Sequence, residues 1–99
     1  MSNETMRVIA RITSQPDKID ELKFILLNLI EPTLSEKGCV SYQLLQDKTA
    51  AVEFVFIEEW ASASAEAAHM STSHVQEALS KAQPLLAKAP DICRYVIIA

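Results

Sequence analysis

Four segments of this 99-residue chain have the pattern of β-strands, and helical segments lie between the first two and between the last two. In residues 6–13, Val8, Ala10 and Ile12 lie on one face, as in a half-buried strand. Polar residues at 48–50 are typical of a turn and make the second and third strands a hairpin. β-branched and aromatic residues are frequent in the other three strand segments, 39–47, 51–60 and 91–98.

The first helical segment is predicted to run from about Pro16 to Lys37, because apolar residues recur at helical spacing along one face. Pro32 lacks a backbone N–H and is expected to kink or break this helix. Gly38 is the only glycine of the chain, and a left-handed cap at the helix end is its expected role. Two shorter helices are expected to follow the third strand, capped by Ser62 or Ser64 and by Ser71 or Ser73, and ending near Met70 and Pro84.

The resulting order, β-α-β-β-α-β, predicts one α+β domain over residues 1–99 with a ferredoxin-like fold. In that topology a four-stranded antiparallel sheet has its helices on one face, and the second and fourth strands lie at opposite edges. Cys39 and Cys93 then cannot pair within one chain, and their spacing is not that of a metal motif. We therefore expect both thiols to be reduced.

Apolar residues occupy both faces of the last two strands, which is unusual for a sheet with one face in water. The chain is 49% hydrophobic, a large apolar share for a domain of this size. Helices cover one face of the predicted sheet, and a second copy of the chain is expected to cover the other. The sequence thus predicts a homodimer.

Nine basic and thirteen acidic residues give a net charge of −4, and the basic residues form no cluster. A protein that binds nucleic acid needs a basic surface to meet the phosphates, so this class is excluded. The chain has no apolar run long enough for a membrane helix, and no membrane partner is expected. The segment Met1–Thr5 lacks the pattern of a secretion signal, which predicts a cytoplasmic protein.

Glu58 is the polar residue that stands out, because it shares a strand face with Phe54, Phe56 and Trp60. A carboxyl group beside large aromatic side chains is desolvated, which raises its pKa and suits it to proton exchange. The alternative is a glutamate at a strand end that reaches water or pairs with Arg7 or Arg11.

Three further side chains could take part in catalysis or ligand binding, namely the indole of Trp60 and the imidazoles of His69 and His74. The Trp60 N–H can orient a ligand oxygen, and His69 or His74 can serve as a general base. Each also has a structural alternative, as a core residue or a solvent-facing histidine. The two histidines are five residues apart and off one helical face, so no metal site is predicted. Tyr42, Phe54, Phe56 and Tyr95 are expected to contact a small apolar or aromatic ligand.

Several of these motifs, in this order, resemble the antibiotic-biosynthesis-monooxygenase family, and within it the quinol-monooxygenase-like subgroup. The segment Glu36–Tyr42 resembles the family pattern E-P-G-C-x-x-Y, with Lys37 in place of the proline. The segment Phe54–Trp60 resembles a strand that ends in E-x-W. The resemblance also includes Arg7–Arg11, Pro16-Asp17, Ala68-His69, Ser73-His74 and Tyr95.

The resemblance implies a dimeric α/β barrel with a pocket between sheet and helices in each subunit. It implies a monooxygenase that uses dioxygen on a small aromatic substrate such as a quinol or anthrone, without metal, flavin or haem. Trp60 and His69 would be the principal catalytic pocket residues, with Glu58 and His74 as further candidates. Haem-degrading relatives use an Asn on the first strand, and residues 7–13 contain none.

Two alternatives come from other classes of function. The first is an isomerase of a small keto or phosphorylated, sugar-like signalling metabolite, and binding of the phosphate requires Arg7 or Arg11 to face the pocket. The second is a ligand-binding or dimerisation module without catalysis, because resemblance in fold does not establish activity.

Overall fold

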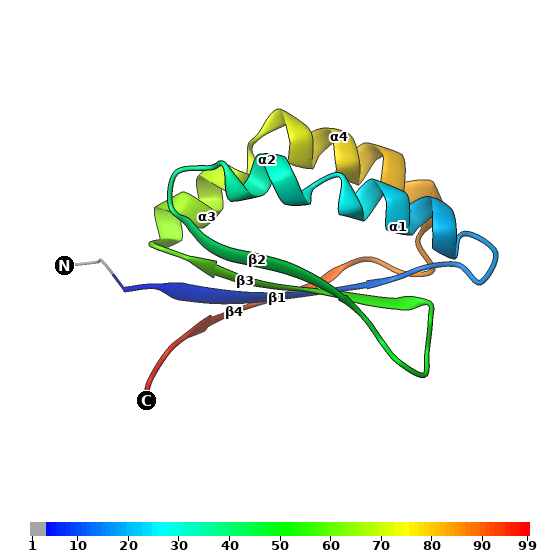
Figure 1. Cartoon of the computed structure of the whole chain (residues 1–99), viewed down its shortest axis with the longest axis horizontal. Helices are drawn as coiled ribbons and strands as arrows, with labels where there is room; N and C mark the ends of the chain where they lie inside the picture. Colours follow the sequence, from blue (N-terminus) through cyan, green and yellow to red (C-terminus); the bar gives the residue numbers. More distant parts are fainter. Residues whose placement is uncertain (1–3) are drawn as a thin grey trace.

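The computed structural model describes residues 4–99 as a four-stranded antiparallel sheet with all its helices on one face (Figure 1). This confirms the ferredoxin-like α+β fold. Its elements in chain order are β1 (Met6–Thr13), α1 (Ile19–Leu27), α2 (Ile30–Leu34), β2 (Cys39–Gln46), β3 (Glu53–Trp60), α3 (Ala63–Met70), α4 (Ser73–Ala82), the 3₁₀-helix η1 (Gln83–Leu85) and β4 (Asp91–Val96). The expectations for the N-terminus and for one domain over 1–99 extend to residues 1–3, which lie outside the described part.

The strand order is β2-β3-β1-β4, so β2 and β4 form the two edges as expected. Cys39 on β2 and Cys93 on β4 are both free thiols. The last strand is shorter than predicted, because Val96 pairs with Met6 at the beginning of β1. Residues 97 and 98 therefore have no further β1 residue to pair with.

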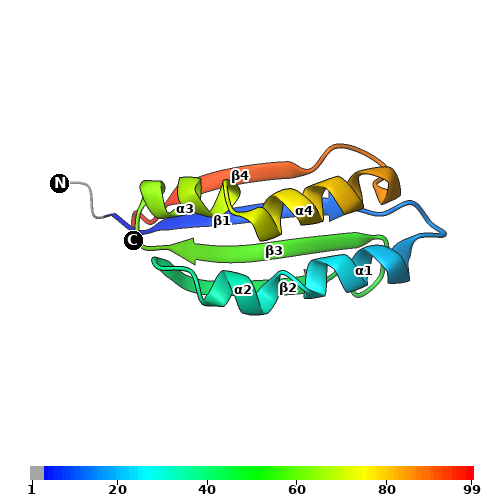
Figure 2. The same ribbon diagram turned by 90° about the horizontal axis from the view of Figure 1, so that it is seen from above.

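The inner face of the sheet and the helices enclose one core. Val8, Phe54, Phe56 and Trp60 project from the strands and are buried against the helices, which confirms the predicted alternation. In Figure 2 the helices form two rows, with α1 and α2 along the β2 edge and α3 and α4 nearer β1. No helix within residues 4–99 combines the length and the hydropathy needed to cross a membrane.

The long helix predicted from Pro16 to Lys37 is wrong in extent. The Lys18 N–H donates to the Gln15 carbonyl, which closes a turn before α1 begins at Ile19. The break falls at Asn28 and Leu29 rather than at Pro32 itself. Pro32 has no N–H for the carbonyl four residues earlier, and its ring crowds that same carbonyl. Pro32 therefore interrupts the helix one turn earlier, at Asn28, whose carbonyl loses its helical hydrogen bond.

Gly38 adopts the left-handed conformation that was predicted, with φ of +91°. It does not cap the preceding helix, which ends at Leu34 with Ser35 as its C-terminal cap. A Cβ atom at Gly38 would lie 2.6 Å from the Ala65 Cβ in α3. The close approach lets the loop before β2 pack directly on α3, which carries a residue of the site described below.

Replacing Gly38 by Ala is expected to lower the free energy of unfolding by about 2–3 kcal/mol, measured by urea denaturation. The cost has two parts, the left-handed backbone and the clash with Ala65. The double variant Gly38→Ala/Ala65→Gly removes only the clash and should recover part of the loss. A Gly38→Ala protein as stable as the wild type would contradict this account.

Candidate active site

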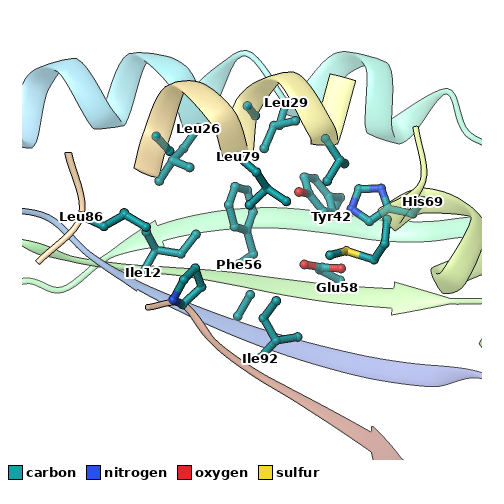
Figure 3. A pocket seen from close by; sticks show the side chains of 16 residues that line it. Ile12, Leu26, Leu29, Tyr42, Phe56, Glu58, His69, Leu79, Leu86 and Ile92 are labelled. Atoms are coloured by element: carbon teal, nitrogen blue, oxygen red, sulfur yellow. The ribbon is translucent and has the colours of Figure 1, made fainter. Parts of the chain in front are cut away.

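A narrow cavity of about 70 Å³ lies between the inner face of the sheet and the helices (Figure 3). Its walls are mainly aliphatic, with Ile12, Leu26 and Leu86 at one end. Tyr42, Glu58 and His69 bring polar groups to the other end, near α3. An apolar cavity with a few convergent polar groups is the usual form of a small-molecule site.

Glu58 projects from β3 into this cavity and is only 5% exposed. Its Oε1 accepts a hydrogen bond of 2.8 Å from the Trp60 indole N–H. Burial raises the pKa of the Glu58 carboxyl, although the Trp60 hydrogen bond and His69 oppose this shift. Glu58 does not pair with Arg7, which instead lies 3.3 Å from Glu59 on the other face of the sheet. The desolvated carboxyl predicted from the strand pattern is therefore present.

The Trp60 side chain is fully buried and does not line the cavity. Its ring centroid lies 4.6 Å from that of His69, and its N–H is engaged by Glu58. The expectation that this N–H orients a ligand oxygen is wrong in this structure, because the donor already has an acceptor two residues away. The Trp60 indole thus holds the carboxyl of Glu58 by a hydrogen bond and packs against the ring of His69.

His69 lies on α3, lines the cavity and is 3% exposed. Its Nδ1 lies 2.8 Å from Glu36 Oε2, and His74 Nε2 lies 2.6 Å from the same oxygen. An ionised carboxylate only accepts hydrogen bonds, which assigns the proton of a neutral His69 to Nδ1. The Nε2 atom is then an acceptor, and it has no hydrogen-bond partner among residues 4–99. This is the arrangement of a general base oriented by a carboxylate.

Two helix caps place the histidines. The Ser62 hydroxyl accepts a hydrogen bond from the Ala65 N–H and begins α3, as predicted. The helix α4 is capped by Thr72 rather than by Ser71 or Ser73. The Thr72 hydroxyl accepts from the Val75 N–H and donates to the His69 carbonyl, which links the two helices at the site.

Of the four aromatic residues expected to contact a ligand, only two line the cavity. Tyr42 and Phe56 line the cavity, with ring centroids 4.9 Å apart. Burial and the nearby Glu58 carboxylate raise the pKa of the Tyr42 hydroxyl. Phe54 is buried in the core but does not line the cavity. Tyr95 pairs with Arg7, lies on the opposite face and is 48% exposed.

Three residues around the site were not among the predicted site residues, although Glu36 begins one of the motifs that resemble the family. Glu36 is 33 residues from His69 and 38 from His74, so no local spacing signals the contact. Glu66 is buried on α3 and forms a two-pronged ion pair with Arg94 on β4, with both N···O distances 3.0 Å. The guanidinium of Arg94 is therefore already paired with a carboxylate.

In the isomerase alternative, binding of a phosphate required Arg7 or Arg11 to face the pocket. Both alternate with the inner-face residues of β1, and neither lines the cavity. The described residues that line the cavity include no lysine or arginine that could bind a phosphate. The site geometry therefore does not favour a phosphorylated substrate.

The raised pKa of Glu58 predicts how stability depends on pH. A carboxyl group whose folded-state pKa exceeds the unfolded value, about 4.3, contributes stability that is fully present below that value. The contribution is lost as pH rises through the folded-state pKa. Denaturation at several pH values should show wild type losing stability relative to Glu58→Gln over this window. A difference independent of pH would contradict the assignment.

The family model for antibiotic biosynthesis monooxygenase matches residues 5–81. An uncharacterized protein of Synechocystis is 34% identical over 97% of this chain, which spans 65% of that relative's length. Two crystal structures have the same fold. PA3566 from Pseudomonas aeruginosa is 28% identical, with a TM-score of 0.92 over 100% of this chain and 99% of that one. Rv0793 from Mycobacterium tuberculosis is 27% identical, with a TM-score of 0.91 over 96% of each chain. A Caulobacter crescentus structure named for the same family gives 28% identity and a TM-score of 0.90, over 98% of this chain and 92% of that one. The chain belongs to the antibiotic biosynthesis monooxygenase family.

Proposed function

We propose that this protein is a cofactor-independent monooxygenase that oxygenates a small phenolic substrate, with His69 as the base. The observation that carries the proposal is the buried imidazole of His69, held at Nδ1 by the Glu36 carboxylate and placed at the wall of an apolar cavity. The family of the chain and a further structure named antibiotic biosynthesis monooxygenase (26% identity, TM-score 0.90) support a monooxygenase-type role.

The chemistry needs a base and a dry cavity. His69 Nε2 takes the phenolic proton, and the resulting electron-rich anion passes one electron to dioxygen. Superoxide and the substrate radical then combine through a new C–O bond, and the imidazolium of His69 protonates the peroxide. His69 next removes the proton on the oxygenated carbon while the O–O bond breaks, and that proton and the departing hydroxide form water. A quinol and O₂ thus give a hydroxyquinone and H₂O, and the substrate supplies all four electrons.

Glu58 lies where negative charge develops. Its Oε1 is held by Trp60, so its second oxygen is the one available to the cavity. Burial raises the pKa of this carboxyl, so it keeps its proton to higher pH, and in its protonated form it donates a hydrogen bond to a substrate oxygen or to the reduced oxygen species. Tyr42 adds a second hydroxyl donor, and burial keeps its proton in place.

Cavity size narrows the substrate class. A volume of about 70 Å³ is smaller than ordinary ligand sites of roughly 300–1,000 Å³. Leu79, which is 41% exposed, and the half-buried Met70 lie among the lining residues, and their rotamers can change to enlarge the cavity. We infer a single-ring quinol in preference to a three-ring anthrone.

Oxygen uptake with a panel of quinols and anthrones tests the function against a control without protein, because these compounds also oxidise spontaneously. The expected result is uptake above the control, greater for single-ring quinols. Uptake equal to the control across the panel would contradict the proposal and leave a ligand-binding module without catalysis.

A homodimer is the second part of this proposal. The face of the sheet without helices carries partly exposed apolar side chains, among them Leu45 and Tyr95. A second subunit on this face would bury them and leave the cavity open on the helical side. Light scattering at micromolar concentration should give twice the chain mass, and a monomeric mass would contradict the dimer.

A further inference from the structure

We propose that Glu36, His69 and His74 form a binding site for a zinc-like divalent cation that competes with the use of His69 as a base. The three ligands come from the loop after α2, from α3 and from the first turn of α4. Their donor atoms all lie within 4.8 Å of one another. Two imidazoles and one carboxylate are a ligand set that zinc takes in proteins, with the remaining position filled by water.

The donor atoms are close to metal spacing but are held by hydrogen bonds. Bond lengths of about 2.0–2.2 Å place two ligands of tetrahedral zinc about 3.3 Å apart. The observed N···O separations are 2.8 Å for His69 and 2.6 Å for His74. Replacing the two shared protons by a cation therefore requires each pair to open by only about 0.5–0.7 Å.

Burial of the three side chains shows which of them can make that movement. The His69 side chain is 4% exposed and packs against Trp60, so it is the fixed ligand. Glu36 lies in the loop before Gly38, and the His74 side chain is 25% exposed. A groove between α1 and α4, lined by Asn28, Glu77 and Lys81 among others, reaches His74. The groove gives a hydrated ion a route to the site from solvent.

The consequence for catalysis follows from the two nitrogens of one imidazole. A neutral histidine that binds a metal through Nδ1 carries its remaining proton on Nε2. The nitrogen of His69 available to the cavity would then be a donor and could not accept the substrate proton. This part of the inference rests on the proposed function, whereas cation binding does not.

Cobalt absorption measures binding directly. The variant Cys39→Ser/Cys93→Ser serves as the background, because both cysteines are free and thiols also bind cobalt. We expect saturable Co²⁺ binding at one ion per chain. His74→Ala and Glu36→Gln in that background should each weaken it by at least about tenfold, whereas Glu31→Gln removes a charge from exposed α2 surface and should not. No saturable binding, or equal binding by all variants, would overturn the proposal.

Zinc inhibition tests the competition. With a quinol that the wild type oxygenates, saturating Zn²⁺ should lower turnover by at least about tenfold, and His74→Ala should be resistant. Equal inhibition of both proteins would overturn the competition. If the wild type consumes no oxygen, the proposed function fails, and the cobalt titration still decides whether the cation site exists.

Discussion

Replacing His69 by Gln should lower the rate of oxygen consumption by about 10²–10⁴-fold, the usual contribution of a general base. Glutamine can still donate a hydrogen bond to Glu36, which lies 2.8 Å from Nδ1 of His69 in the wild type. It has no basic nitrogen, so the loss isolates proton transfer from the structural contact. Steady-state oxygen uptake, corrected for spontaneous oxidation, measures the effect.

His74→Gln is the matched control for this variant. His74 also contacts Glu36 but does not line the cavity. It should retain more than about a tenth of wild-type activity, because loss of a partner that acts through another residue affects orientation only. Full activity in His69→Gln would show that His69 is not the base.

Replacing Trp60 by Ala should lower the free energy of unfolding by about 3–5 kcal/mol, the usual cost of removing a large aromatic side chain from a core. Trp60 is the largest fully buried side chain of the described residues. The substitution also leaves the buried carboxyl of Glu58 without its hydrogen-bond donor. Urea denaturation monitored by circular dichroism measures the loss.

Trp60→Phe is a milder change, because it keeps an aromatic ring in the core and removes the N–H donor together with part of the ring volume. The expected loss is about 1–3 kcal/mol, the cost of an unsatisfied buried polar group. The pKa of Glu58 should rise further, because its hydrogen bond to Trp60 opposes the effect of burial. Tyr95→Phe on the outer face is the matched control and should change stability little. A Trp60→Phe protein as stable as the wild type would contradict the role assigned to this hydrogen bond.

The strands were predictable because alternation is a local property of the sequence. Val8, Ala10 and Ile12 are buried as their spacing required. The helix break was predicted but misplaced, because the clash made by Pro32 occurs one turn earlier, at Asn28. The last strand has apolar residues on both sides, so its pattern alone did not decide which side faces the core. Tyr95 lies on the outer face because it pairs with Arg7.

The site was predictable where its residues share one strand. Phe56 and Glu58 are two positions apart, and both line the cavity. The bond between Trp60 and Glu58 depends on rotamers, which strand periodicity does not specify. Glu36 could not be assigned to the histidines, because its loop reaches them only after the sheet and helices have packed.

The most direct test of the central claim is the origin of the oxygen in the product. Wild-type protein treated with chelator is given a single-ring quinol under ¹⁸O₂, and the product is analysed by mass spectrometry. The account predicts one ¹⁸O atom in each hydroxyquinone, formed at a rate above the control without protein and lost in His69→Gln. Product oxygen that comes from water, or a rate equal to the control, would contradict it.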